Sequence, residues 1–193
     1  MNIITDALPD FVTVGKVKYK VHTDFRIWME FDRILHQRDI ETKDKIMMIF
    51  KLCLENKRCK ILPEEVTEMM EALKLFYLCG KEEKSVKMEK KERVLDFAED
   101  SGYIYSAFLA QYGIDLLSIP YMHWYVFFAL LDGLEDEREI IKIMRFRLAK
   151  PEKEQNPEKI KYLKRMKEFY ALPDTRTERE KEEEIANILF EAF

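Results

Sequence analysis

The segment 121–131 constrains the fold more than any other part of the sequence, because it is apolar on nearly every face of a helix. One face is formed by Trp124, Phe127, Phe128 and Leu131, at the i, i+3, i+4, i+7 spacing. The other faces carry Met122, Tyr125, Val126, Ala129 and Leu130. A helix of this kind must be buried, and it is too short to cross a bilayer, which takes about 20 apolar residues. We therefore expect it to be the central helix of a protein core, opened by Pro120.

The residues before this segment predict a second buried helix and a turn. A helix over 96–112 would place Ile104, Ala107 and Phe108 together and would end at Gly113, where a left-handed residue commonly terminates a helix. Asp115 follows in the connection to the central helix, where its carboxylate can accept backbone N–H groups. We interpret Asp115 as a structural turn residue.

The N-terminal third predicts a hairpin followed by three amphipathic helices. Residues 11–14 and 17–21 flank Gly15-Lys16, a suitable two-residue hairpin turn. Thr23 is the expected N-cap of a first helix that ends near His36. A second helix begins after Thr42, and a third begins at Pro63 and stops at Gly80.

The C-terminal part reads as one core helix and an extension. Apolar residues at helical spacing follow the acidic segment 135–139 and continue to Leu148. A polar linker over 151–157 separates them from a seventh helix with an apolar stripe ending at Phe169 and Tyr170, and from a final segment, 177–193. We therefore predict a helical core domain with the hairpin at 1–150 and a C-terminal helical extension at 151–193. The last two helices carry narrow stripes and are the best candidates for an element that docks on a partner.

These patterns together predict a mainly α protein: a multi-helix bundle around a central buried helix, with a small N-terminal β-hairpin. Five glycines and six prolines in 193 residues suit long helices with short connections. The charged segment 81–93 can be read as a binding tether or as a solvated loop, and we favour the loop.

Composition argues against several partners and cofactors. The net charge is −4, with both signs mixed along the chain, so no basic face for nucleic acid is expected. No segment predicts a membrane-spanning helix. The three cysteines, Cys53, Cys59 and Cys79, fit neither a zinc framework nor a CxxC pair, and we expect no metal and no cofactor.

His123 is the one residue whose position raises the question of catalysis. The chain lacks HExxH, a phosphate-binding glycine loop and a calcium-loop pattern. A histidine on an apolar helix is more often hydrogen-bonded to a buried carbonyl or carboxylate, with Asp115 or Asp100 as conceivable partners, than bound to a ligand. We therefore expect a structural role and no enzymatic activity.

Several residues of the central stretch form a pattern that resembles a known family. They are Asp100, Tyr103, Phe108, Tyr112, Gly113, Asp115, His123, Trp124 and Phe127. The opening of the chain, with Leu8-Pro9 and Thr23-Asp24-Phe25-Arg26, adds to the likeness. The sequence resembles the bacteriophage proteins named for gene product fifteen of a Listeria phage, which occur in tailed phages and prophages of Gram-positive bacteria. The likeness covers roughly the first three-quarters of the chain.

The resemblance implies a role in tail morphogenesis. Genes of this family lie between those for the tail tube and the tape-measure protein, where tail assembly chaperones are encoded. The expected function is thus a chaperone in the host cytoplasm that binds the tape-measure protein, tail tube subunits or both. A structural component retained in the virion is the first alternative, and an enzyme acting through His123 with Asp100 and Asp115 is the second. Whether the chain forms a homo-oligomer stays open.

Overall fold

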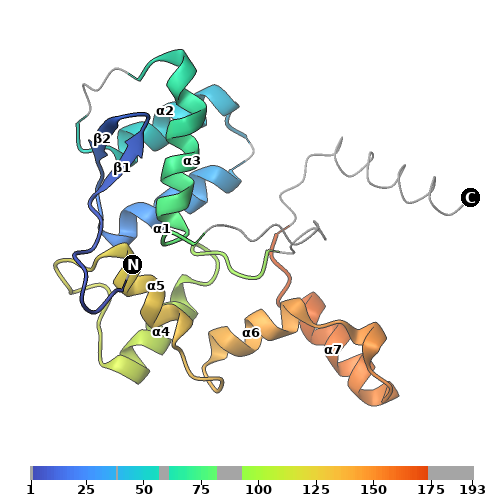
Figure 1. Ribbon diagram of the computed structural model, residues 1–193. Coiled ribbons are helices and arrows are strands. Elements are labelled where there is room, and N and C mark those ends of the chain that lie inside the picture. Colours follow the sequence, from blue (N-terminus) through green and yellow to red (C-terminus); the bar gives the residue numbers. More distant parts are fainter. Residues whose placement is uncertain (1, 38, 57–60, 82–92, 174–193) are drawn as a thin grey trace, which may run out of the picture.

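The computed structural model describes residues 2–37, 39–56, 61–81 and 93–173, and these residues fold into a mainly helical structure with one small sheet (Figure 1). Two strands, β1 (Phe11–Val14) and β2 (Val17–Lys20), pair antiparallel with Phe11 opposite Lys20. Gly15 takes a positive φ of 56° in the turn between them, as a two-residue hairpin requires. Both the mainly α fold and the N-terminal hairpin agree with the sequence prediction.

Three helices pack with the hairpin to form the first half of the structure. They are α1 (Phe25–His36), α2 (Thr42–Cys53) and α3 (Val66–Tyr77), the last preceded by a 3-10 turn at Pro63–Glu65. Val12 and Val14 of β1 are buried, because the strand lies against α3. The Glu68 carboxylate of α3 accepts the Gly15 N–H at 2.7 Å and so ties the hairpin turn to the helix.

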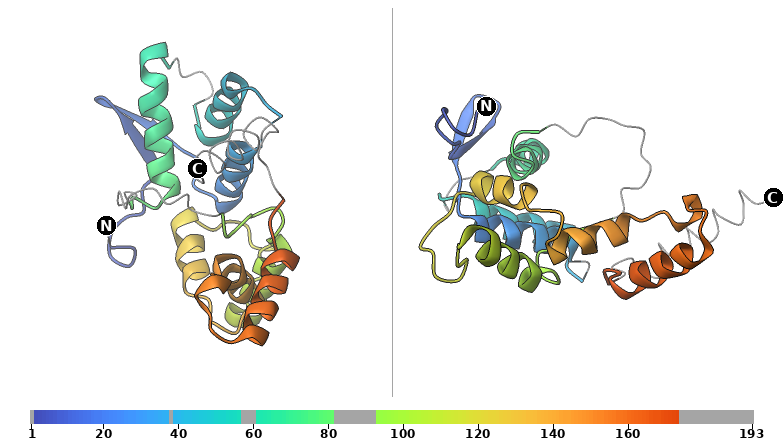
Figure 2. Two further views of the ribbon diagram at one scale, coloured as in Figure 1. Left: turned by 90° about the vertical axis from the view of Figure 1, so that its right-hand side faces the viewer. Right: turned by 90° about the horizontal axis from the view of Figure 1, so that it is seen from below.

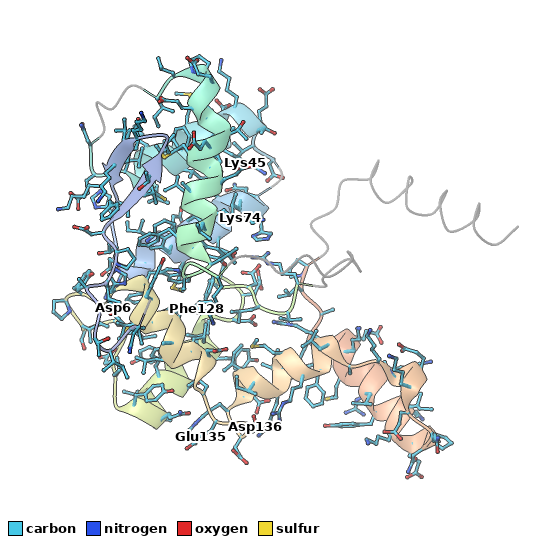
Figure 3. The ribbon with its side chains drawn as sticks, viewed as in Figure 1. Asp6, Lys45, Lys74, Phe128, Glu135 and Asp136 are labelled. Atoms are coloured by element: carbon cyan, nitrogen blue, oxygen red, sulfur yellow. The ribbon has the colours of Figure 1, made fainter. Side chains whose placement is uncertain are left out.

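The second half is built from α4 (Ser101–Tyr112), α5 (Trp124–Asp132), α6 (Glu139–Leu148) and α7 (Pro157–Phe169). Helices α4 and α5 lie beside the end of α1, whereas α6 and α7 extend to one side (Figures 1 and 2). The labelled carboxylates Glu135 and Asp136 lie in the turn between α5 and α6 (Figure 3). The proposed boundary at residue 150 coincides with a 3-10 turn at Pro151–Lys153, and the division into two domains stays a prediction.

Aromatic rings from both halves form the centre of the core. Phe127 of α5 stacks on Phe25 of α1 at 4.7 Å between ring centroids and on Phe108 of α4 at 5.1 Å. Trp124 stacks on Tyr77 of α3 at 5.4 Å. Helix α5 therefore occupies the central position that its apolar composition predicts.

The expected burial of α5 on nearly every face was too broad. Trp124, Tyr125, Phe127 and Leu131 are buried, but Val126, Phe128 and Leu130 are only partly buried and Ala129 is exposed. One side of the helix is therefore fully buried, and the other side is only partly buried.

The predicted start of this helix was also wrong. It begins at Trp124 with His123 as its N-cap, four residues after Pro120. Residues 122 and 123 are instead extended, and this segment pairs with the start of α1: Phe25 N–H donates to Met122 O at 3.0 Å and Trp124 N–H donates to Thr23 O at 2.8 Å. The same pairing places the cap of α1 on Asp24, one residue after the expected Thr23.

Helix α4 ends where the sequence predicts but begins later. It starts at Ser101 because residues 96–100 form a separate turn, in which the Asp96 carboxylate accepts the N–H groups of Ala98 and Glu99. At its C-terminus Gly113 adopts φ 66° and ψ 18°, the left-handed conformation expected there.

Replacing Gly113 with alanine is expected to destabilise the fold by about 1 kcal/mol, because a Cβ at this φ costs roughly 1–2 kcal/mol. No atom lies within 4 Å of the new Cβ, so the cost comes from the backbone alone. Gly102, inside α4 and with equally open surroundings, is the matched control. Gly102→Ala should stabilise by roughly 0.5–1 kcal/mol through helix propensity. Urea unfolding of both variants measures the difference, and two changes of the same sign would contradict this account.

Candidate functional site

His123 lies at the junction of three segments and has both ring nitrogens engaged with the backbone. Nδ1 accepts the Tyr125 N–H at 3.0 Å, which caps α5. Nε2 lies 3.0 Å from the carbonyl oxygen of Pro9. Because Nδ1 is an acceptor, Nε2 carries the proton and donates it, so the ring is neutral. Of the two partner types expected, a carbonyl and a carboxylate, the structure has a backbone carbonyl, that of the partly buried Pro9, and not the carboxylate of Asp100 or Asp115.

Burial lowers the pKa of His123, and the hydrogen bond to Pro9 and the charge of Asp10 only partly oppose that effect. Between the lowered value and the unfolded value of about 6.5, the unfolded chain binds more protons than the folded one. His123 therefore contributes stability that is present above about pH 6.5 and is lost as the pH falls through its folded pKa.

The variant His123→Asn tests this contribution, because asparagine can still cap a helix but does not titrate. As the pH is lowered below about 6.5, the free energy of unfolding of the wild type should fall relative to that of the variant. His36 has the opposite effect, since its hydrogen bond to Asp32 raises its pKa, but it is common to both proteins and cancels. Denaturant unfolding at several pH values measures the difference, and parallel pH profiles would show that His123 does not titrate in this way.

Asp100 forms a buried ion pair with Arg147, a residue that the sequence analysis did not single out as a partner. The guanidinium donates to both carboxylate oxygens, at 2.6 and 2.9 Å, and the two side chains are 2% and 8% exposed. Arg147 also donates to the carbonyls of Val94, at 2.9 Å, and Tyr170, at 2.7 Å. One arginine of α6 thus connects the turn before α4 with the end of α7.

A second buried cluster surrounds Asp32 of α1. Its carboxylate accepts from the Tyr77 hydroxyl at 2.7 Å and from Arg93 at 2.8 Å, and His36 lies 3.5 Å away. Burial acts to raise the pKa of Asp32, but the hydrogen bonds from His36 and Tyr77 and the charges of His36 and Arg93 outweigh it, so the pKa is lowered. The cluster holds a charged carboxylate in place, with its partners already satisfied.

The burial of Asp32 and of Arg147 could have been predicted from the sequence. Asp32 follows Trp28 by four positions and Phe25 by seven, and Arg147 stands in the same relation to Ile143 and Ile140. A charged residue at a position of the apolar stripe is buried with the stripe and needs a partner. The signal indicates burial but does not identify the partner, which lies 47 residues away in the case of Arg147.

The family-like residues fall into three groups. Phe108, Trp124 and Phe127 come together in the aromatic core, and the Tyr112 hydroxyl donates to Leu130 O at 2.9 Å. Asp100, Asp115 and His123 each bind different partners. Asp115 accepts the Leu117 N–H at 3.0 Å, as expected for a turn residue, and hydrogen bonds to Leu117 and Ser118 lower its pKa. Tyr103 is 39% exposed.

No metal-binding cluster is found in the described ranges. No three His, Cys, Asp or Glu side chains there are placed to hold a metal ion. Burial raises the pKa values of the thiols of Cys53 and Cys79 to about 12, so both are protonated at neutral pH.

Cys59 and the predicted final helix at 177–193 lie outside the described residues, as does all but the ends of the charged segment 81–93. None of the described helices is both long and apolar enough to cross a membrane.

The surface is hollowed between α1 and α4, and we call this hollow the α1/α4 groove. Its volume is about 370 Å³, within the range of roughly 300–1,000 Å³ typical of binding pockets. It is lined by Phe25, Arg26, Met29, Glu30, Arg33, Phe97, Ala98, Ser101, Ile104, Tyr105, Leu116 and Leu117. Phe25 and Ile104 are buried, while Leu117 is 82% exposed. The groove lacks histidine, cysteine and unpaired carboxylates among its lining residues and is suited to apolar side chains.

Comparison with known proteins identifies a family. Residues 4–172 match the model of a family described as Bacteriophage Gp15 protein. No curated protein and no solved structure gives a significant match. The matched range includes every described helix and strand, and it confirms the resemblance drawn from the residues of the central stretch.

Proposed function

The chain belongs to the bacteriophage Gp15 protein family, and on that basis we propose that it is a tail assembly chaperone. It would act in the host cytoplasm during virion assembly and bind the tape-measure protein, tail tube subunits or both. The observation that carries the proposal is the family match over residues 4–172, together with the gene position that the family resemblance implies.

Two features of the structure support a protein that works by docking. Every buried side-chain nitrogen and oxygen among the described residues has a hydrogen-bond partner, including His123, so these groups serve the scaffold. Apolar side chains, by contrast, are exposed at the α1/α4 groove and on α7. Leu117 is 82% exposed, Phe169 is 73% exposed and Tyr162 is 50% exposed. Exposed apolar side chains around a groove are typical of binding surfaces.

The retained structural component remains the alternative, and the hairpin is the feature that bears on it. Beyond the β1–β2 pair no further strand joins this sheet in the described ranges, so a neighbouring subunit could add one. Lys16, Lys18 and Lys20 lie in the turn and along β2, however, and lysines on an edge strand oppose such pairing. The chaperone is therefore the better-supported function.

Co-expression with the tape-measure protein of the same genome tests the proposal. The chaperone should raise the soluble fraction of the tape-measure protein and co-purify with it, and purified virions analysed by mass spectrometry should lack the chain. Stoichiometric amounts in virions would instead establish the structural component. Absence from virions without any binding to either tail protein would contradict both.

The groove can be tested in the same pull-down. Leu117→Asp places a charge on an exposed side chain and should weaken tape-measure binding by about tenfold, the effect of losing roughly 1.4 kcal/mol at an interface. Leu109→Asp is the matched control, since Leu109 lies on α4 outside the groove and is 45% exposed. Equal binding by both variants would exclude the groove as the binding surface without affecting the proposed function.

A further inference from the structure

The α1/α4 groove offers apolar contact and few free charges. Arg26 donates to the carbonyls of Leu116, at 3.1 Å, and Ile119, at 2.7 Å, and pairs with Asp24. Arg33 pairs with Glu30 on the same helix. Because both guanidinium groups already have partners, an occupant would be held by the apolar side chains of the groove, among them Phe25, Met29 and Leu117.

The described chain ends close to this groove. Arg147 binds Tyr170 O and, through the same guanidinium, the carboxylate of Asp100. Ala98 and Ser101, on either side of Asp100, line the groove. Figure 1 shows the chain leaving α7 and turning back toward the middle of the structure. The next 20 residues, 174–193, therefore start beside one end of the groove.

The sequence of 174–193 carries the apolar pattern that such a groove accepts. Ile185, Ile188, Leu189 and Ala192 recur at i, i+3, i+4 and i+7, the anchor spacing of a helix bound in a groove. The opposite face of that helix would carry mostly charged and polar residues, such as Arg176, Glu180 and Asn187, together with one aromatic residue, Phe190. An apolar stripe of this kind needs a surface to cover it.

We propose that segment 174–193 docks in the α1/α4 groove of its own chain, with Ile185, Ile188 and Leu189 against Leu117 and Met29. The 12 residues from Pro173 to Ile185 span up to about 40 Å when extended, so the connection permits this. A short linker gives an effective concentration on the order of 1 mM. Even a free peptide affinity of about 100 µM would then keep the segment docked in about nine of ten molecules. The inference concerns the chain alone and does not rest on the proposed function; a tail protein that binds the same groove would have to displace the segment.

Photo-crosslinking of the full-length protein at low concentration tests the docking. A benzophenone amino acid in place of Ile188 should crosslink within one molecule to residues of α1, α4 or the 116–117 turn, identified by mass spectrometry. Leu117→Asp should reduce the yield several-fold, and Leu109→Asp should leave it unchanged. Crosslinks only between two copies would show docking in a dimer and overturn the proposal, as would intramolecular crosslinks that avoid the groove.

Hydrogen exchange on the same protein supplies an independent readout. Ile185→Asp combined with Leu189→Asp should speed exchange in a peptide covering 114–119 by up to about tenfold, because undocking exposes the groove in every molecule. Arg176→Gln combined with Asn187→Asp is the matched control, since it makes the same change in net charge on the opposite face. Identical exchange in the two double variants would overturn the proposal.

Discussion

Replacing Arg147 with methionine is expected to destabilise the folded chain by about 3–5 kcal/mol, the usual effect of removing one partner of a buried ion pair. The substitution leaves the Asp100 carboxylate, 2% exposed, without its bidentate partner. It also removes the donors to Val94 O and Tyr170 O, which hold the turn before α4 and the end of α7. Unfolding in guanidinium chloride, monitored by circular dichroism, measures this loss of stability.

Two further variants distinguish the loss of the buried ion pair from the loss of any arginine charge on α6. Arg145→Met removes the neighbouring arginine on α6, whose pair with Asp136 is exposed, and should leave the melting temperature essentially unchanged. Asp100→Leu combined with Arg147→Met removes both buried charges and should recover a large part of the stability. A double variant as unstable as Arg147→Met alone would show that the carbonyl contacts, and not the unpaired carboxylate, dominate the loss.

Truncating Trp124 to alanine should cost about 3–5 kcal/mol, as expected for a fully buried aromatic residue that leaves a cavity. The indole is 0% exposed, stacks on Tyr77 and Phe127, and donates from Nε1 to Tyr77 O at 2.8 Å. Its loss therefore removes contacts between α5 and α3 as well as ring packing within α5. Thermal and denaturant unfolding measure the effect.

Two further variants, Trp124→Phe and Phe169→Ala, are expected to lower stability less than Trp124→Ala does. Phenylalanine keeps a ring in the core but removes the indole donor to the Tyr77 carbonyl, which then keeps only a long contact with the Cys79 thiol, so a loss of roughly 1–3 kcal/mol is expected. Phe169 is 73% exposed, and its truncation should change stability by less than about 0.5 kcal/mol. If Trp124→Ala were as mild as Phe169→Ala, the core would not be centred on α5.

Local signals in the sequence predicted the elements well where neighbouring residues alone decide them. The hairpin turn at Gly15-Lys16, the start of α2 at Thr42 and the end of α4 at Gly113 all follow from backbone preferences within a few residues. The start of α5 did not. Pro120 suits a helix start, but residues 122–124 pair with 23–25, about 100 positions earlier, and that pairing moves the helix start to Trp124, with His123 as its N-cap.

At the candidate site, too, the sequence predicted what adjacent residues decide and missed what distant residues decide. The sequence predicted that His123 is hydrogen-bonded to a buried carbonyl or carboxylate, since a buried polar group needs a partner. It could not name Pro9, because that contact joins residues 114 apart. The α1/α4 groove was not predicted at all. Apolar residues that line the groove cannot be told from apolar residues of the core in the sequence of these helices. Only the fold decides which of them are left exposed.

The contacts of His123 with Pro9 and of Trp124 with Tyr77 bear on how the protein emerges from the ribosome. The first 80 residues contain the hairpin and three helices, but the Pro9 carbonyl of the lead-in receives its donor from residue 123. The Tyr77 carbonyl at the end of α3 likewise receives the indole N–H of residue 124, in addition to a long contact from the Cys79 thiol. Contacts so distant in sequence are made late, after the intervening loop has closed. A nascent chain halted near residue 110 is therefore expected to remain sensitive to protease, and translation past α5 should be the step that makes its N-terminal half resistant.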